Sequence, residues 1–269
     1  MIIIGEKING SIPSVGQAIA EKDDEIIRQR VRLQVAAGAD FIDCAAGTDT
    51  SVEYETMRWL IDIIQQETDT PVCIDSPDAA LLARLISEGV LNRAGMANSV
   101  SLEGNKCDLV LPLIAGTDWS VIGLTCDDAG IPAEPEKRVE IAKKIIDRAD
   151  KAGVALDKLH IDPCVMSMAV APNSMQDFVY CVEKIHEFAP DVKVTGAISN
   201  ISYGMPARKY VNMSFLTSAV EAGLDSAIMD PTSHNMMGIL FAAAALKGDD
   251  KGGRKYNRAY RKGLFGTKK

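Results

Sequence analysis

The sequence is poor in the residue patterns from which metal centres and disulfide frameworks are built. Its 269 residues include three histidines, and none of its six cysteines forms a Cys-x-x-Cys pair. The histidines are not at metal-ligand spacing. These patterns argue against a zinc site and against disulfides. We therefore expect no metal bound by this chain, free thiols, and a location in the reducing cytoplasm.

The sequence also lacks any apolar run close to the roughly 20 residues that cross a membrane. Residues 1–6, Met-Ile-Ile-Ile-Gly-Glu, have no basic leader and no long apolar core, so they predict a first strand and not a signal peptide. No Gly-x-Gly-x-x-Gly follows this strand, which argues against an open dinucleotide-binding sheet. We therefore expect no membrane association, and a doubly wound open sheet is only the structural alternative to a barrel.

Charge is distributed unevenly along the chain. The net charge is −8, yet nine Lys and Arg stand against two Asp from Lys247 to the end, which gives this segment +7 and leaves −15 for the rest. An acidic body argues against nucleic acid as the main ligand. The basic segment is expected to be a solvated, partly disordered terminus. The alternative is that it helps dock a partner protein or covers an acidic surface.

Strand-like and helix-like segments alternate eight times. The predicted strands are 1–5, 41–43, 72–74, 93–98, 119–125, 159–162, 192–199 and 227–230, and helical patterns cover 22–37, 50–64, 77–88, 109–114, 139–149, 174–188, 209–222 and 235–247. Such alternation predicts a parallel sheet, and a closed barrel of eight units needs about 250 residues. We therefore predict an α/β protein with a single (β/α)8 TIM barrel over residues 1–247 and a basic C-terminal tail over 248–269.

The stretch from Pro71 to Pro77 illustrates one such unit. Val72, Cys73 and Ile74 form an unbroken apolar run, as expected of a strand that is buried on both faces. Ser76 is a good N-cap and Pro77 suits the first helical position, so a helix is predicted to start at once. Asp75 falls between strand and helix, where barrels place their functional groups.

Polar residues follow most of the predicted strands. They are Glu6 or Asn9, Asp43, Asp75, Asn98, Thr125, Asp162, Asn200 and Asp230. Any one of them is more often a cap or turn residue than a ligand-binding group. Together, carboxylates and amides suit a ligand with several N–H donors, such as a 2-amino-4-oxo pyrimidine edge. The neighbouring thiols of Cys44, Cys73 and Cys164 are predicted to be small buried groups and not nucleophiles.

Several motifs, in this order, resemble the methyltetrahydrofolate:corrinoid methyltransferases. The matching segments are Ile4-Gly5-Glu6-Lys7-Ile8-Asn9-Gly10, Cys73-Ile74-Asp75-Ser76, Ala97-Asn98-Ser99, Ile122-Gly123-Leu124-Thr125, Ile161-Asp162-Pro163 and Ser199-Asn200-Ile201-Ser202 with Arg208. These enzymes are pterin-binding barrels related to the folate domain of cobalamin-dependent methionine synthase. The resemblance covers the chain up to about residue 246.

The resemblance implies roles for individual residues. Asp75, Asn98 and Asp162 would hold the pterin ring, with Glu6 and Asp43 in the same binding set. Asn200 would lie near N5 and, with Asp75, would be catalytic, while Arg208 would meet the charged portion of the ligand. Tetrahydrofolate would be the substrate, a corrinoid-binding protein carrying cobalamin the partner, and a homodimer the assembly.

The sequence departs from the family pattern in two places near the pterin pocket. Ala45 stands where relatives often have Asn, and the glycine before Asn200 is displaced to Gly196. The mechanistic hypothesis is methyl transfer between a corrinoid cobalt and N5 of tetrahydrofolate, and we favour the direction towards tetrahydrofolate. A dihydropteroate synthase-like enzyme should carry a basic Ser-Arg-Lys motif where this chain has Ser199-Asn200-Ile201-Ser202. A non-catalytic pterin-binding subunit would bind tetrahydrofolate without turnover.

Overall fold

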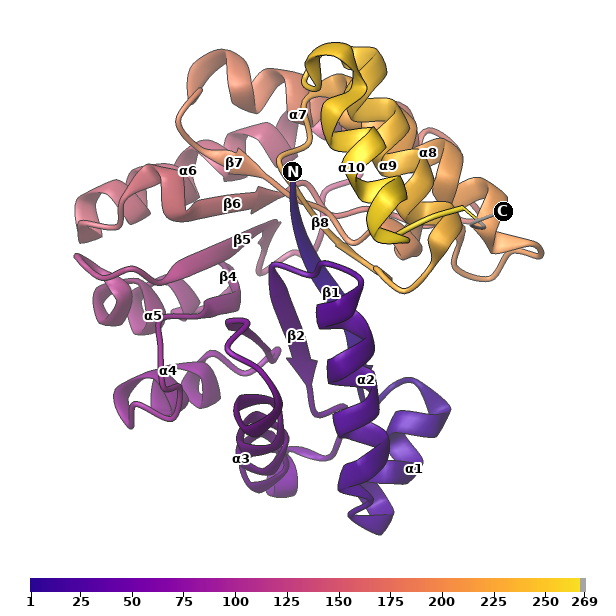
Figure 1. The fold of residues 1–269 in the computed structure, drawn as a ribbon. Helices are drawn as coiled ribbons and strands as arrows, with labels where there is room; N and C mark the ends of the chain where they lie inside the picture. Colours follow the sequence, from indigo (N-terminus) through magenta and orange to yellow (C-terminus); the bar gives the residue numbers. More distant parts are fainter. Residues whose placement is uncertain (267–269) are drawn as a thin grey trace.

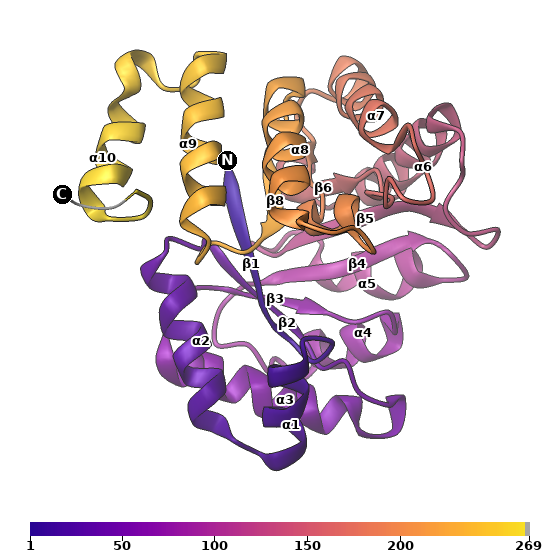
Figure 2. The same ribbon diagram turned by 90° about the vertical axis from the view of Figure 1, so that its right-hand side faces the viewer.

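A computed structural model describes residues 1–266. Its eight parallel strands form one sheet in the order β7-β6-β5-β4-β3-β2-β1-β8, so neighbours in sequence are neighbours in space. Helices surround the strands (Figures 1 and 2). The strands are β1 (Ile2–Asn9), β2 (Phe41–Ala45), β3 (Val72–Asp75), β4 (Met96–Leu102), β5 (Ser120–Asp127), β6 (Leu159–Asp162), β7 (Lys193–Val194) and β8 (Ser226–Met229).

The two ends of the sheet meet, which closes the barrel. Strand β7 is short, but the backbone after it continues alongside β8. The Asp225 amide donates to the Val194 carbonyl at 3.0 Å, and the Ile228 amide donates to the Gly196 carbonyl at 3.0 Å. The predicted (β/α)8 barrel is therefore confirmed.

The α-helices follow the strands on the outside of the barrel. They are α1 (Pro13–Glu21), α2 (Asp24–Ala36), α3 (Thr50–Glu67), α4 (Ala79–Ser87), α5 (Lys106–Ile114), α6 (Pro135–Ala152), α7 (Ser174–Phe188), α8 (Arg208–Ala222), α9 (His234–Lys247) and α10 (Arg254–Lys262). Short 3₁₀ turns occupy η1 (Leu156–Lys158), η2 (Ile198–Ser202) and η3 (Lys251–Gly253). No helix within residues 1–266 combines the length and apolar character of a membrane span.

The first unit differs from its sequence prediction. Strand β1 continues to Asn9, beyond the predicted end at residue 5, and helix α1 was not predicted. The sequence pattern did not indicate this helix because it contains Gly16, and glycine is a poor helix former. A Cβ at Gly16 would lie 2.7 Å from the Gly10 carbonyl oxygen, so the close packing of α1 on the β1 loop requires glycine there.

The predicted start of the helix that follows β3 was wrong by two residues. Helix α4 starts at Ala79, and its N-cap is Asp78, whose carboxylate accepts from the Ala80 amide at 2.8 Å. The predicted cap Ser76 lies before the helix, where its hydroxyl donates to Glu53 at 2.7 Å. Helix α3 starts at Thr50 as predicted, and its N-cap is Asp49, whose carboxylate accepts from the Ser51 amide at 2.9 Å.

Strands β4 and β7 also differ from prediction. Strand β4 covers 96–102 instead of 93–98, and β7 covers two residues of the predicted 192–199. After β7 the chain turns into η2, whose Ser199 carbonyl accepts from the Arg208 guanidinium at 2.6 Å. A backbone carbonyl that accepts from a side chain in this way has an alternative to the backbone hydrogen bonds of a sheet.

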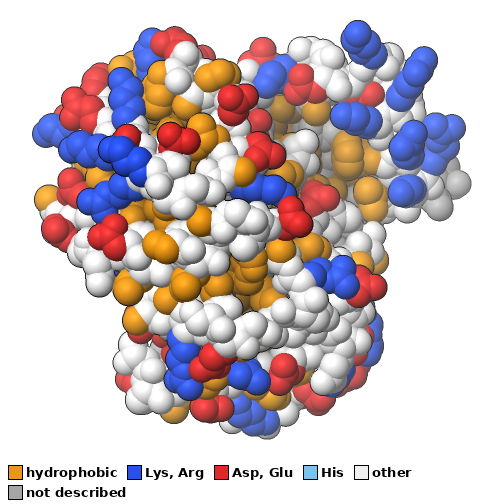
Figure 3. Space-filling model, turned by 90° about the vertical axis from the view of Figure 1, so that its left-hand side faces the viewer, with side chains coloured by type: hydrophobic (Ala, Val, Ile, Leu, Met, Phe, Trp, Pro, Cys, Tyr) orange, Lys and Arg blue, Asp and Glu red, His pale blue; other side chains and the backbone are white. Residues whose placement is uncertain are grey.

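The described part of the basic tail is ordered, contrary to the expectation of a partly disordered terminus. Asp250 accepts from the backbone amides of Lys255 and Tyr256 at 2.9 and 2.8 Å, and α10 follows. The buried Phe265 then packs on Phe241 of α9 and on Tyr256, with ring centroids 5.9 and 4.9 Å apart. Figure 3 shows the Lys and Arg side chains gathered at this edge of the molecule. Residues 267–269 of the predicted tail lie outside the described residues.

Candidate functional site

The carboxyl ends of the strands surround one polar cavity of about 670 Å³. Each of the eight strands, or the loop that follows it, contributes a lining side chain. The volume lies within the range of small-molecule sites, roughly 300–1,000 Å³. The structure brings together the seven site residues predicted from the sequence, and all of them line this cavity: Glu6, Asp43, Asp75, Asn98, Asp162, Asn200 and Arg208.

An apolar layer inside the barrel forms the floor of the cavity. It is a small cluster of Ile4, Cys73, Met96, Ile122 and Ile228. Side chains two positions apart on a strand point to the same face. Glu6, Asp75 and Asn98 each follow an inward apolar residue by two positions, so the strand geometry raises them above this floor.

Asp43 is the most deeply placed carboxylate. It is 2% exposed, and its Oδ1 has no hydrogen-bond partner. Burial raises the pKa of Asp43 well above its usual range, and the nearby charge of Asp75 raises it further. A buried acceptor without a partner costs free energy, which an N–H donor from a ligand would recover.

Asp75 ends strand β3 and lies opposite Asn98 in the register of β3 and β4. Burial raises the pKa of Asp75 to about 6, with a smaller contribution from the charge of Glu53. Glu53 of α3 is 6% exposed and accepts from Ser76, the residue after Asp75. Glu53 therefore holds the turn that carries Asp75, which the sequence did not reveal.

Asp162 ends strand β6 and is 5% exposed. Burial raises its pKa to about 7, although the Cys164 amide, which donates to Asp162 Oδ1 at 2.7 Å, opposes the rise. The buried Arg138 of α6 lies behind this loop and donates to the carbonyls of Pro163 and Cys164, each at 3.4 Å. Arg138 was not predicted, because its place on a helix does not distinguish it from a surface cation.

The mouth of the cavity carries charge of both signs. The Ser199 hydroxyl donates to Glu6 Oε2 at 3.1 Å, which links β1 to the turn that bears Asn200. Burial raises the pKa of Glu6, and the hydrogen bond from Ser199 opposes the rise. Asn200 itself is exposed, while Arg208 donates to the Ser199 carbonyl and to the Ser202 hydroxyl.

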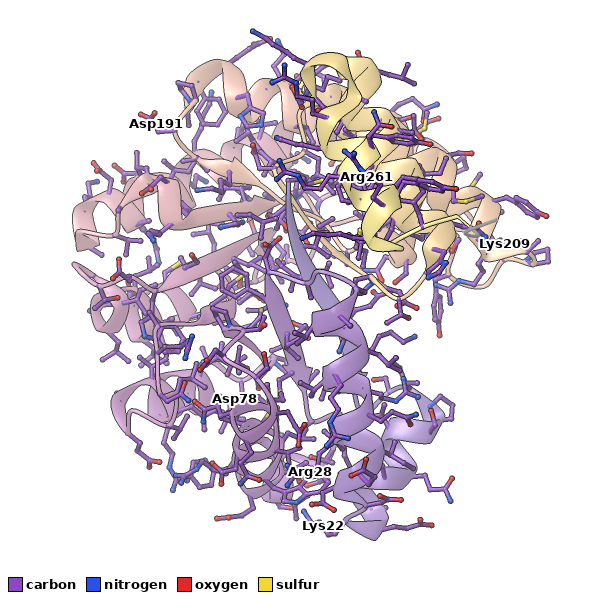
Figure 4. The ribbon with its side chains drawn as sticks, viewed as in Figure 1. Lys22, Arg28, Asp78, Asp191, Lys209 and Arg261 are labelled. Carbon is purple, nitrogen blue, oxygen red and sulfur yellow. The ribbon has the colours of Figure 1, made fainter. Side chains whose placement is uncertain are left out.

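Asp230, one of the polar residues expected at the strand ends, also lines the cavity, and so do Lys7, Lys209 and Asn212, for which no role was predicted. Lys7 Nζ lies 3.3 Å from Asp230 Oδ2, so the two form an ion pair between β1 and the loop after β8. The sequence could have indicated Lys7, because it stands next to Glu6 in a motif that resembles the family. Lys209, labelled in Figure 4, lies near the start of α8, and Asn212 lies one turn further along. Helix periodicity did not reveal either.

The donor set of the cavity suits organic N–H groups better than a metal ion. Within residues 1–266 no three His, Cys, Asp or Glu side chains come together as a metal-binding group. The expectation that the chain binds no metal stays a prediction. Paired carboxylates beside an amide can accept a ring N–H and an exocyclic amine together.

Comparison with known proteins agrees with this geometry. The family of pterin-binding enzymes matches residues 9–230. The methylcorrinoid:tetrahydrofolate methyltransferase of Eubacterium limosum is 47% identical over 268 residues, which cover 99% of this chain and 98% of that protein. The methionine synthase of Mycobacterium tuberculosis (strain ATCC 25618 / H37Rv) is 28% identical over 85% of this chain, which spans only 20% of that protein.

Among solved structures, a dihydropteroate synthase from Yersinia pestis superposes with a TM-score of 0.65 over 91% of this chain and 93% of its own. At 17% identity, this likeness concerns the fold alone. The full-length match and the family match confirm the resemblance drawn from the motifs. The chain therefore belongs to the family of pterin-binding enzymes.

Proposed function

We propose that this protein transfers a methyl group from a methylated corrinoid to N5 of tetrahydrofolate. The observation that carries the proposal is the 47% identity, over nearly the whole of both chains, to a protein named for that reaction. The cavity supports it, because buried carboxylates and an amide line the space that a pterin would need. The activity falls in the methyltransferase class EC 2.1.1.

The deep residues act as the pterin-binding group. The carboxylates of Asp75 and Asp162 accept the N–H donors of the pyrimidine ring, and the amide of Asn98 serves a neighbouring donor and acceptor. The unpartnered oxygen of Asp43 supplies one more acceptor. This arrangement fixes the ring at the bottom of the cavity and leaves its N5 edge towards the mouth.

Asn200 and the mouth residues act on the reacting edge. N5 of tetrahydrofolate attacks the methyl group with its lone pair, the cobalt–carbon bond breaks, and the electron pair of that bond stays on cobalt as cob(I)alamin. The N5 proton is then released. The protein contributes mainly position, since a well-oriented pair of reactants needs no covalent methyl carrier. Glu6 and Arg208 fix the turn that presents Asn200.

The corrinoid arrives as a substrate on a partner protein. The described residues offer a cavity open at the strand ends, and the pterin lies within it, so the corrinoid must approach from the mouth. We propose further that the protein works in the cytoplasm, without nucleic acid, and as a homodimer. The outer groove between α7, α8 and α9, with Leu246 87% exposed at its edge, supports a second protein surface there.

Anaerobic mixing of the protein with methylcobalamin and tetrahydrofolate tests the reaction directly. We expect the absorption spectrum of methylcobalamin to change to that of cob(I)alamin while methyltetrahydrofolate forms. Asp75→Ala should abolish this conversion, whereas Asp78→Ala, which removes the exposed cap of α4 three residues away, should retain it. Turnover only from cob(I)alamin and methyltetrahydrofolate would reverse the proposed direction.

The alternatives make different predictions. Dihydropteroate synthase activity is not favoured, since the likeness to such enzymes is limited to the fold and the basic motif is absent. Formation of dihydropteroate from a pterin pyrophosphate and p-aminobenzoate would revive it. A non-catalytic subunit would bind tetrahydrofolate but fail to turn over even with a methylated corrinoid protein.

A further inference from the structure

Strand β1 carries a β-bulge where it reaches the cavity. Its register with β2 pairs Gly5 with Ile42 and resumes at Ile8 with Cys44. Two residues of β1 therefore lie opposite a single residue of β2, which is the arrangement that defines a bulge. Bulges are frequent next to active sites, because the extra residue changes the direction of the side chains around it.

The bulge places two consecutive side chains in the cavity. In a regular strand Glu6 and Lys7 would point to opposite faces. Here both line the cavity, and the Lys7 ammonium lies 3.3 Å from Asp230 Oδ2. The alternation is shifted after them, since the fully buried Ile8 belongs to the large core cluster with the surrounding helices and Asn9 lines the cavity. A regular strand would offer only one of the two charges to a ligand.

Gln34 of α2 holds this bulge in place. Its side-chain oxygen, Oε1, accepts from the Lys7 backbone amide at 3.0 Å. Lys7 has no residue opposite it in the registers of β1 with β2 and with β8, so the glutamine supplies an acceptor in place of a sheet partner. Gly5 leaves room for it, because a Cβ there would overlap Gln34 Oε1.

Packing alone does not account for a glutamine at this position. Gln34 is fully buried, and among the described residues its Nε2 has no hydrogen-bond partner. An unpartnered buried donor lowers stability, so an apolar side chain of similar length would pack at least as well. An apolar side chain could not accept from the Lys7 amide. The contact with the bulge is therefore what distinguishes glutamine from an apolar residue here.

The bulge is coupled to two loops at the mouth of the cavity. Glu6 accepts from the Ser199 hydroxyl at 3.1 Å, and Asn200 is the next residue of that turn. Lys7 reaches the loop after β8 through its ion pair with Asp230. A displaced bulge would therefore move both contacts together.

We propose that Gln34 is a positioning residue of the site, which holds the β1 bulge and thereby orients Glu6 and Lys7 towards the reacting edge of the pterin. The inference about turnover rests on the proposed function. Gln34 acts from the helix side of β1 and touches no reacting atom. Asp75 and Asp162 are carried by other strands, so their binding of the pterin should not depend on Gln34.

Gln34→Met tests the proposal, because it keeps the length of the side chain and removes the acceptor. We expect kcat for methyl transfer from methylcobalamin to fall roughly 10- to 100-fold, the effect of a small displacement of reacting groups. The dissociation constant of tetrahydrofolate in anaerobic calorimetry should change less than about threefold, with the same stoichiometry. A merely structural role would lower the rate and the stoichiometry together, because less of the protein would be folded.

Three further variants separate position from stability. Gln34→Glu keeps an acceptor oxygen but buries a carboxyl group, so it should be less stable than Gln34→Met and yet more active. Gly5→Ala crowds the same oxygen and should lower kcat similarly, with no further loss when it is combined with Gln34→Met. Val31→Ala, one turn earlier on α2 and also fully buried, should lower stability in urea but leave kcat within about twofold.

The proposal is wrong if Gln34→Met keeps the wild-type kcat, or if its kcat and its tetrahydrofolate stoichiometry fall together. Hydrogen exchange of the Lys7 amide tests the structural part without any ligand. We expect exchange at least about tenfold faster in Gln34→Met than in the wild type, and equal rates would show that Gln34 does not hold the bulge. If the wild type transfers no methyl group at all, the proposed function fails, while the exchange rates still decide whether Gln34 holds the bulge.

Discussion

Two carboxylates of this cavity have raised pKa values, because burial favours the protonated form over the ionised one. Asp162 has a pKa of about 7 and Asp75 one of about 6, both above the ordinary value of 3.8, and burial is the main cause. Each therefore binds its proton more tightly in the folded state than in the unfolded one. Folded-state stability from these groups is present at low pH and falls as the pH rises from about 4 to about 7.

The first prediction concerns Asp162→Asn. At pH 8 the wild-type carboxylate is ionised and buried, whereas the amide is neutral and can still accept from the Cys164 amide. We expect the variant to be more stable than the wild type by about 2–4 kcal/mol at pH 8, and by much less at pH 5, where Asp162 is already protonated. Urea denaturation at the two pH values measures the difference.

The comparison with wild type at each pH matters because another group acts in the opposite sense. The buried His160, whose Nδ1 lies 2.7 Å from the Ser226 hydroxyl, has its pKa lowered to about 3 by burial. It loses stability as the pH falls from about 6.5, when the unfolded chain takes up the proton first. If Asp162→Asn raised the free energy of unfolding equally at pH 5 and pH 8, Asp162 could not be a buried, ionised carboxylate at pH 8.

The second prediction concerns Asn200→Ala. Asn200 is exposed and lies in the turn η2, whose Ser199 bonds to Glu6 and Arg208. We expect kcat for methyl transfer to fall by roughly 10- to 100-fold, with tetrahydrofolate affinity changed less than about threefold, because the lost contact belongs to the reacting edge. Asn92→Ala, an exposed change on the chain before β4, is the matched control. A loss confined to affinity would assign Asn200 to pterin binding instead.

The seven site residues could be predicted because each closes a recognisable strand or belongs to a family motif. Their supporting residues could not. Glu53 and Arg138 lie on helices, where a buried charge has no sequence signal, and their partners are known only once the loops are placed. Lys7 of β1 meets Asp230 in the loop after β8, a contact between residues more than 200 positions apart.

Among the elements, the strands and helices of the barrel followed from hydrophobic runs and from Gly stops, whereas irregular segments did not. Helix α1 contains Gly16, and the 3₁₀ turn η2 replaces the end of a predicted strand. Both depend on contacts with other parts of the chain. Helix α10 was not predicted because most of its residues are charged or polar, and the few apolar ones that pack on α9 are too few to show a helical pattern.

The third prediction tests whether that packing stabilises the molecule. Phe265 is 6% exposed and contacts the rings of Phe241, Tyr256 and Tyr260. Phe265→Ala should lower the free energy of unfolding by about 3 kcal/mol. Val52→Ala, which shortens a 48% exposed side chain on α3, should change it by less than about 0.5 kcal/mol. Equal stability of the two variants would show that the tail is dispensable for folding.

At the scale of the whole molecule, the outer faces of α8 and α9 are the surfaces that we propose for assembly into a homodimer. Leu246 is 87% exposed beside the groove that α7, α8 and α9 form. The fourth prediction is a homodimer, with twice the chain mass of 28.9 kDa in light scattering. Leu246→Arg should return the single-chain mass, and Leu33→Arg, at a 52% exposed position on α2, should not. A wild-type mass of 28.9 kDa would exclude the dimer.

The closure of the barrel at β7 gives the cavity two walls of different mechanical stiffness. Asp43, Asp75, Asn98 and Asp162 are carried by strands whose backbone amides are bonded to both neighbours, whereas Asn200 follows a strand of two residues and sits on a turn held by side chains. Amide hydrogens of β3 to β6 should therefore exchange with solvent only on global opening, and those of residues 198–204 much sooner. One wall thus keeps its shape through a catalytic cycle, and the other can yield when a large second substrate approaches.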